Sequence, residues 1–170
     1  MNDVEKTLFL VGRVLVGSFF LLMGMNHFGD LAGMSATVAD LGLPGAPVIV
    51  LVTGLLLVLA GISFIVGFHP LLGVLAAALF FVPTTLVMHA FWALDDPTAR
   101  QAELFTFLRN VGMLGSVLVF LAIPRPWPLS VDRSLRRWRF ERRLRLEEQE
   151  EQQEQDEHYE YDEQPVDELS

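Results

Sequence analysis

Apolar residues dominate four stretches of residues 1–124, and in a helix they would cover every face. These stretches span residues 8–25, 46–68, 70–92 and 111–123, and the helix of the last one is expected to begin near Pro97. Because a helix of about 20 residues crosses the ~30 Å hydrocarbon core of a bilayer, the pattern predicts four membrane-spanning helices. The alternative, a soluble helical bundle, requires polar outward faces. The second and third stretches contain no Asp, Glu, Lys or Arg, which argues against it.

The connection between the first two stretches, residues 26–45, has a helical pattern of its own. Leu31, Met34, Val38 and Leu41 recur at helical spacing after Asp30, whose carboxylate suits a helix start. We expect a short amphipathic helix that lies at the membrane surface. A lid over a pocket between the spans is the alternative. The next long connection contains Asp96-Pro97, which indicates another helix start.

Charge divides the chain into parts. The formal net charge is −9, but residues 147–170 hold 12 acids and no Lys or Arg, whereas residues 1–146 hold 12 bases and 9 acids. A segment as polar as 147–170 buries too little apolar surface to offset its ordering entropy. We therefore predict a four-span domain over 1–124, a basic juxtamembrane segment over 125–146, and an acidic tail over 147–170 that is disordered or folds back on the basic segment.

Arginines after the fourth stretch indicate the orientation. Eight of them lie in residues 125–145, whereas residues 26–45 contain neither Lys nor Arg. Positively charged flanks remain in the cytoplasm, so the C-terminus is predicted to be cytoplasmic, and with four spans the N-terminus is too. Trp127 and Trp138 accompany these arginines, a combination that suits anionic lipid headgroups. The expected partner of the basic segment is thus the bilayer of the plasma membrane rather than nucleic acid.

Arg13 and Pro83 are the clearest intramembrane exceptions to the apolar pattern. Arg13 lies about five residues inside the first stretch, roughly 7–8 Å from its edge at 1.5 Å per residue. Arg13, Gly17, Phe20, Gly24 and His27 follow helical spacing, and small residues on that face favour contact with another helix. Snorkelling toward headgroups is the alternative for Arg13. Pro83 removes a backbone donor from the third span and frees the carbonyl of Leu79.

Polar groups also gather at the opposite, outer ends of the spans. His27 and His89 close the first and third spans, and Trp92 and Asn110 are expected at the same level. Such residues suit proton transfer or recognition of a quinone carbonyl, whereas ordinary interfacial anchoring is the alternative. No ligand spacing such as H-x-x-x-H supports a metal or haem site, and we predict no metal.

Several reaction classes find no support in the sequence. The chain has no cysteine, which excludes disulfides, thiolate nucleophiles and iron–sulfur clusters for this chain acting alone. It also has no Walker loop, dinucleotide fingerprint, nucleophile elbow or HExxH motif. The residues alone therefore leave open whether the chain is an enzyme.

The sequence resembles the DoxX family of small four-span membrane proteins over about residues 8–123. The resemblance rests on Arg13, on Gly24-Met25-Asn26-His27-Phe28, on Gly54 and Gly61, on residues 67–73 (GFHPLLG), on Val82-Pro83-Thr84-Thr85, on His89-Ala90-Phe91-Trp92, on Asp96-Pro97 with Gln101, and on Phe107-Leu108-Arg109-Asn110. Many members carry an acid early in the second span, where this chain has Val52-Thr53-Gly54. This departure argues against a proton relay carried over from relatives.

The resemblance implies an all-α integral membrane bundle and a role in quinone-linked redox chemistry, as an accessory component or subunit beside a redox enzyme. His27, His89, Trp92 and Asn110 would line an outer pocket, with quinone as the implied cofactor, and Arg13 would hold the inner half of the bundle. Two alternatives remain open. One is a non-enzymatic scaffold that recruits a cytoplasmic protein through its C-terminal segment, and the other is a small-solute transporter.

Overall fold

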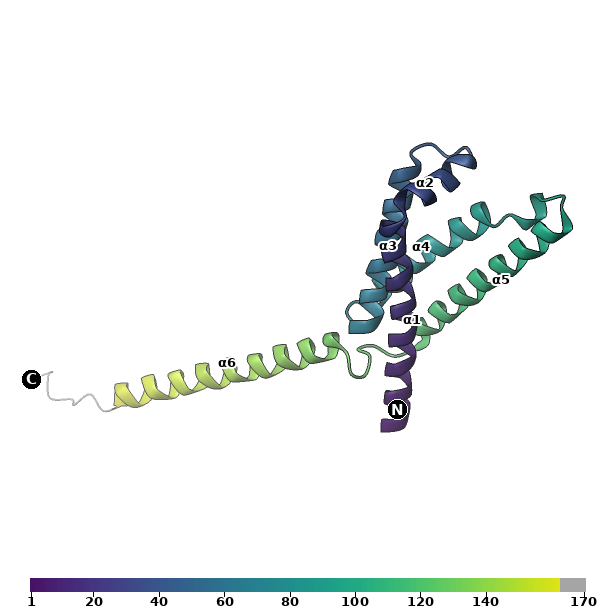
Figure 1. Ribbon diagram of the computed structural model, residues 1–170. Coiled ribbons are helices and arrows are strands. Elements are labelled where there is room, and N and C mark those ends of the chain that lie inside the picture. Colours follow the sequence, from purple (N-terminus) through teal and green to yellow (C-terminus); the bar gives the residue numbers. More distant parts are fainter. Residues whose placement is uncertain (163–170) are drawn as a thin grey trace, which may run out of the picture. The chain divides into compact units, whose positions relative to one another are not determined.

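The computed structural model describes residues 1–162, and this part of the chain is built from helices and their connections (Figure 1). The all-α fold class is confirmed. In chain order, the α-helices and the two 3-10 helices (η) are α1 (Asp3–Gly29), α2 (Leu31–Asp40), α3 (Ala46–Val66), α4 (Pro70–Met88), η1 (Phe91–Ala93), α5 (Pro97–Val119), η2 (Phe120–Ala122) and α6 (Val131–Asp162).

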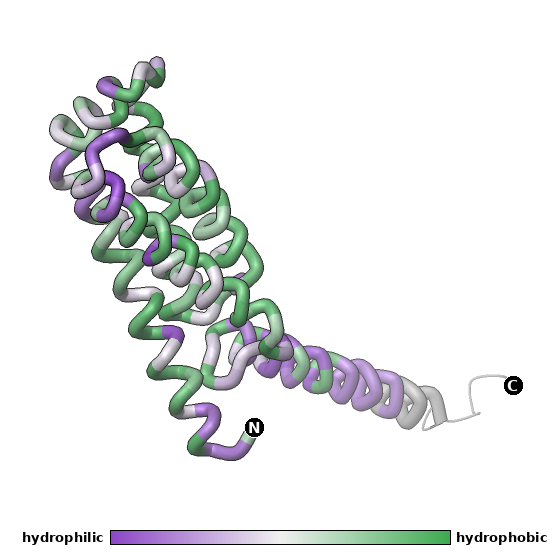
Figure 2. Tube along the Cα trace, turned by 90° about the vertical axis from the view of Figure 1, so that its right-hand side faces the viewer, coloured by the Kyte–Doolittle hydropathy of each residue, from purple (hydrophilic) through white to green (hydrophobic). Residues whose placement is uncertain are grey.

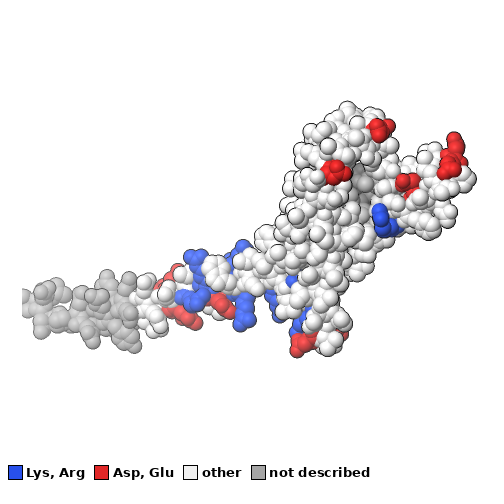
Figure 3. Space-filling model, viewed as in Figure 1, with Lys and Arg blue, Asp and Glu red and all other residues white. Residues whose placement is uncertain are grey.

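Four helical segments are long and apolar enough to cross a bilayer, which confirms the four predicted spans. They are Asp3–Gly29, Ala46–Val66, Pro70–Ala93 and Pro97–Ala122. Apolar residues run along these helices in Figure 2, and the face seen in Figure 3 carries few charged residues between their ends. In water this much exposed apolar surface would drive aggregation. The chain is therefore a multi-pass membrane protein whose outer surface is solvated by lipid.

Local signals in the sequence fix where several helices begin. Asn2 forms a capping box with Glu5 at the start of α1, because each side chain satisfies a backbone N–H of the other residue. The Asp30 carboxylate accepts a hydrogen bond from Gly33 N at 3.2 Å, and that of Asp96 accepts one from Ala99 N at 2.7 Å. Both predicted helix starts are confirmed.

Glycines hold α1 against α3 at two levels along the pair. A Cβ on Gly61 would lie 2.7 Å from the carbonyl oxygen of Gly17, and a Cβ on Gly24 would lie 2.8 Å from that of Gly54. No side chain fits at such distances, so the two backbones touch where only glycine allows it. The buried residues of α1 are Arg13, Gly17, Phe20 and Gly24, the same face that the spacing indicates. This face of α1 therefore points at protein.

The two ends of the bundle differ in what fills them. The Arg13 end comprises the start of α1, the end of α3, η2 and residues 123–132. Buried aromatic rings fill it, among them Phe64 and Trp127, which are both 0% exposed. The His27 end comprises the end of α1, α2, the start of α3 and the end of α4. There a smaller cluster of Val38, Ala46 and Val50 packs beneath α2.

The chain forms two compact units, Met1–Asp132 and Arg133–Ser170. The first extends past residue 124, where the four-span domain was predicted to end, because Trp127 and Asp132 contact the bundle. In the second, α6 continues as a helix through residues 147–162. This differs from the disordered tail predicted there. Glu and Gln have high helix propensity, which explains a helix without a packed core. Residues 163–170 of that prediction lie outside the described residues.

Candidate functional site

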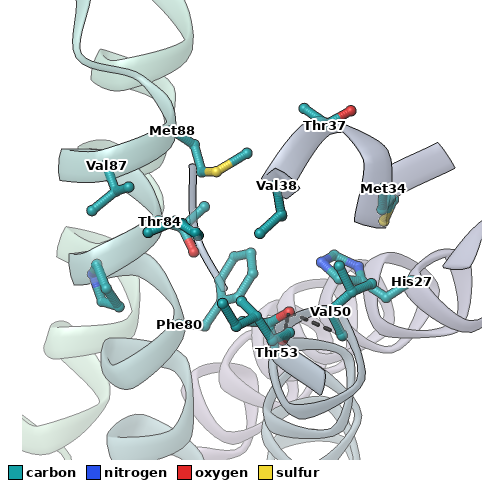
Figure 4. Close-up of a pocket in the computed structure, with 13 residues that line it drawn as sticks. His27, Met34, Thr37, Val38, Val50, Thr53, Phe80, Thr84, Val87 and Met88 are labelled. Carbon is teal, nitrogen blue, oxygen red and sulfur yellow. Dashed lines mark hydrogen bonds between the residues drawn. The ribbon is translucent and has the colours of Figure 1, made fainter. Parts of the chain in front are cut away.

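A cavity of about 430 Å³ lies among α1, α2, α3 and α4 at the His27 end (Figure 4). This volume falls within the range of about 300–1,000 Å³ typical of small-molecule sites. The lining is mainly aliphatic and aromatic, with four polar side chains and no Asp, Glu, Lys or Arg. The lining residues are His27, Met34, Thr37, Val38, Leu43, Ile49, Val50, Thr53, Phe80, Pro83, Thr84, Val87 and Met88.

Helix α2 forms one wall of the cavity. Its residues Met34, Thr37 and Val38 line the space, and Val38 is only 7% exposed. Leu31, Met34 and Val38 repeat at helical spacing, so one face of α2 is apolar and packs onto the start of α3. This placement favours the lid interpretation over a helix that only lies at the membrane surface.

The wall opposite α2 includes Phe80, Pro83, Thr84 and Val87 of α4. Pro83 lies inside α4, and the helix continues past it to Met88. Because proline offers no N–H, the carbonyl of Leu79 loses its partner within the helix. Proline inside a span is tolerated where the neighbouring structure is protein or a cavity rather than lipid. Pro83 therefore belongs to the cavity wall as well as to the helix.

His27 projects from α1 into the cavity, and its ring orientation is fixed on two sides. Its Nδ1 lies 2.8 Å from the carbonyl oxygen of Met23, one turn back. Its ring meets the Phe80 ring edge to face, with centroids 5.8 Å apart. A Cβ on Gly54 would lie 2.8 Å from the Cβ of His27, so glycine is required across from it. Since a carbonyl oxygen only accepts hydrogen bonds, Nδ1 carries the ring proton.

The cavity threonines differ in how their hydroxyl groups are used. Thr53 donates to the carbonyl oxygens of Ile49 at 2.8 Å and Val50 at 3.0 Å, and Thr37 donates to that of Gly33 at 3.2 Å. These bonds lie within their own helices and engage the hydroxyl hydrogen. Thr84 makes no side-chain hydrogen bond within the described residues, and its hydroxyl group is the one left to rotate toward a ligand.

The four residues expected in one outer pocket are divided by the structure. His27 lines the cavity, and His89, Trp92 and Asn110 do not. His89 Nδ1 instead lies 2.8 Å from Glu103 Oε2 on α5, Trp92 packs against Phe91 and Phe107, and Asn110 is buried at 6% exposure. All four residues were expected at the same depth in the bilayer, but depth does not specify which helices face one another. Met34 and Thr53, which do line the cavity, went unassigned as site residues.

Arg13 and Trp127 form a second polar feature, at the other end of the bundle. Arg13 is 1% exposed, its Nη2 donates to the carbonyl oxygen of Leu129, and its guanidinium carbon lies 6.0 Å from the Trp127 ring centre. Within the described residues Nε and Nη1 of Arg13 and Nε1 of Trp127 have no hydrogen-bond partner. Arg13 therefore does not snorkel toward the headgroups, because its side chain is buried in protein. Trp127 was expected among the headgroups, and it is fully buried as well.

Residues 123–132 place Trp127 and Leu129 against the Arg13 end of the bundle. Trp127 packs between Phe9 and Phe64, with ring centroids at 5.2 and 6.2 Å. The backbone N–H of His69 donates to Asp132 Oδ2 at 3.0 Å. A Cβ on Gly67 would overlap the Arg13 guanidinium. The Arg13 end is therefore closed by packing. Within the described residues, no group of three His, Asp or Glu side chains is placed to hold a metal ion.

Comparison with known proteins identifies the chain. Residues 8–90 match the model of the DoxX family. These residues form a DoxX domain. It is also 25% identical over 129 residues to the inner membrane protein YphA of Escherichia coli (strain K12), covering 76% of this chain and 91% of that relative. No solved structure matches. The family match contains every residue that lines the cavity, and it ends before α5 and α6.

Proposed function

We propose that this DoxX-domain protein is the membrane component of a quinone-linked redox system and that it holds the quinone ring in the cavity among α1–α4. The observation that carries the proposal is the cavity itself, which is apolar, uncharged and about 430 Å³ in volume. Pockets of this kind bind small ligands with a few placed polar groups that fix their orientation. His27, Thr53 and Thr84 are such groups, and the redox chemistry itself would come from the quinone and a partner enzyme.

The charge pattern of the cavity supports a neutral, lipid-soluble ligand. A charged ligand would need a counter-charge in this low-dielectric setting, and no Asp, Glu, Lys or Arg lines the space. The apolar face of an aromatic or quinone ring would pack against Phe80 and Met88, and polar groups at its edge would meet the threonine hydroxyl groups of the lining. Quinones of the bilayer have this character.

Purified protein in lipid nanodiscs provides the test. Titration with a short-chain ubiquinone and its quinol should show saturable binding, and Thr84→Phe should abolish it because a phenyl ring fills the cavity. Leu118→Phe is the matched control, since Leu118 is exposed on α5 and lies outside the cavity. Binding that is equal in Thr84→Phe and the wild-type protein would refute a quinone site in this cavity.

We further propose that the protein resides in the inner membrane with both termini in the cytoplasm. The arginine distribution supports this orientation. The cysteine-free sequence allows a direct test with single cysteines and a membrane-impermeant maleimide. Thr98→Cys should react in intact cells, whereas Glu150→Cys should react only after the membrane is opened. The reverse pattern would invert the proposed topology.

A scaffolding role for the C-terminal part is a second candidate, favoured by α6. This helix extends as a separate unit, and Trp138 and Phe140 are 51% and 62% exposed among arginines. Exposed aromatic residues beside cations suit a lipid headgroup layer or a docked protein. Deletion of residues 133–170, which removes this unit with both aromatic residues, should then release a co-purifying partner and leave cavity binding unchanged. Retention of that partner by the shortened chain would exclude a scaffold built on this unit.

A further inference from the structure

We infer that the cavity selects the reduced, hydroxyl-bearing form of its ligand, a hydroquinone or related phenol, over the oxidised form that carries carbonyl groups. This inference rests on the proposed function, because it assumes that an aromatic ring enters the cavity. It concerns binding alone and follows from which polar atoms along the lining are left to accept a hydrogen bond and which are left to donate one.

His27 presents an acceptor. Its Nδ1 is 2.8 Å from the Met23 carbonyl oxygen, and this contact requires the proton on Nδ1. The other ring nitrogen of a neutral imidazole then has a lone pair and no hydrogen. A ligand hydroxyl group donates to such a nitrogen, whereas a ligand carbonyl oxygen meets it lone pair to lone pair. His27 in its neutral form therefore favours the hydroxyl-bearing ligand.

The bonded threonines add acceptors of the same kind. The hydroxyl hydrogen of Thr53 points at the carbonyl groups of Ile49 and Val50 (Figure 4, where Thr53 and Val50 are labelled). The hydroxyl hydrogen of Thr37 points at the carbonyl group of Gly33. A hydroxyl group has one hydrogen and two lone pairs, so after these bonds each Oγ1 retains accepting capacity only. Breaking the bond within the helix to serve a ligand carbonyl would leave a backbone acceptor without that partner.

Thr84 alone among the polar lining residues is able to serve either ligand form. Its hydroxyl group has no hydrogen bond within the described residues, and it rotates to donate or to accept. A quinone carbonyl thus finds one donor in the lining, at Thr84. The two hydroxyl groups of a quinol find acceptors at His27 and Thr53, and at Thr84 as well. No cationic side chain lines the space to supply a further donor.

The size of the preference follows from the number of hydrogen bonds that change. One net hydrogen bond contributes roughly one power of ten in affinity. The quinol gains at least one bond that the quinone lacks, and the quinone leaves one carbonyl oxygen without a donor. We expect the quinol to bind about tenfold more tightly than the quinone of the same ring and side chain.

The experiment compares a short-chain ubiquinol with the corresponding ubiquinone, under anaerobic conditions, on full-length protein in nanodiscs. His27→Gln is the decisive variant, because its carboxamide group both donates and accepts. The tenfold preference should fall to about twofold or less in His27→Gln. His89→Gln, which changes the histidine outside the cavity, should retain the full preference. Thr53→Val removes a second acceptor, should weaken quinol binding severalfold, and keeps the test decisive if His27→Gln does not fold.

The outcomes separate this inference from the proposed function. Equal or tighter binding of the quinone by wild-type protein, with both forms lost in Thr84→Phe, would overturn the inference and leave the quinone site intact. A quinol preference that persists unchanged in His27→Gln and Thr53→Val would also overturn it. Failure of both forms to bind wild-type protein would contradict the proposed function itself.

Discussion

The Arg13 end and the His27 end of the bundle are built on the same pair of helices, yet one is filled and the other is hollow. At the Arg13 end, Phe64 contacts Phe120 with ring centroids 5.0 Å apart, and Trp127 contacts Phe120 at 5.3 Å. At the His27 end, α2 covers a cavity of about 430 Å³. The packed end carries stability, and the hollow end is available for a ligand.

The spacing between α1 and α3 does not produce this difference. The Gly17–Gly61 and Gly24–Gly54 approaches hold α1 equally close to α3 toward both ends. The ends differ in what packs beside this pair. Large rings of η2 and residues 123–132 fill the Arg13 end, whereas the small and aliphatic side chains of α2 only cover the His27 end. What packs beside α1 and α3, rather than the distance between these two helices, therefore decides where the bundle is open.

The largest expected effect comes from removing the ring at the centre of the packed end. Trp127→Ala should lower the free energy of unfolding by about 3–5 kcal/mol, as for other fully buried large rings. Met88→Ala, at the cavity wall, should cost only about 1 kcal/mol because part of its surface already faces empty space. Unfolding followed by circular dichroism in detergent measures both. Equal losses for the two variants would show that the ends do not differ in packing.

An intermediate effect is expected where the two ends share their scaffold. Gly61→Leu should lower the free energy of unfolding by about 3 kcal/mol, since backbone atoms of Gly17 and Leu21 surround the new Cβ and do not yield as a side chain does. Gly112→Leu is the matched control, because a Cβ there meets nothing within 4 Å. Unfolding followed by circular dichroism measures this effect too. A destabilised Gly112→Leu with an unaffected Gly61→Leu would contradict the glycine contact.

Sequence periodicity predicted the features that depend on neighbours along one helix. The four spans, the starts at Asp30 and Asp96, and the buried face through Arg13 and Gly24 all follow from residue spacing. The hydrogen bond from Arg13 to Leu129 joins residues 116 positions apart, and no local pattern encodes it. For the same reason the sequence placed Trp127 among headgroups, although it is buried in the core.

The candidate site was predicted only in part, for a related reason. Apolar spans and flanking charges indicate the depth of a residue in the bilayer, and by that criterion His27, His89, Trp92 and Asn110 belong together. Depth does not specify direction around a helix axis. His27 faces α4 across the cavity, whereas His89 faces Glu103 on α5. Which helices pack against each other follows from long-range packing and becomes visible only in the fold.

The smallest effect tests whether the charge at the packed end is required for stability. Arg13 makes one hydrogen bond, to the Leu129 carbonyl, and two of its nitrogens lack partners within the described residues. Replacing a buried charge by an apolar side chain of similar volume is often neutral or stabilising. Arg13→Met should therefore change the free energy of unfolding by no more than about 1 kcal/mol, whereas Arg13→Ala should cost about 2–3 kcal/mol because it leaves a hole beside Trp127. A loss in Arg13→Met as large as in Arg13→Ala would show that the guanidinium group itself, rather than its packing volume, closes this end of the bundle.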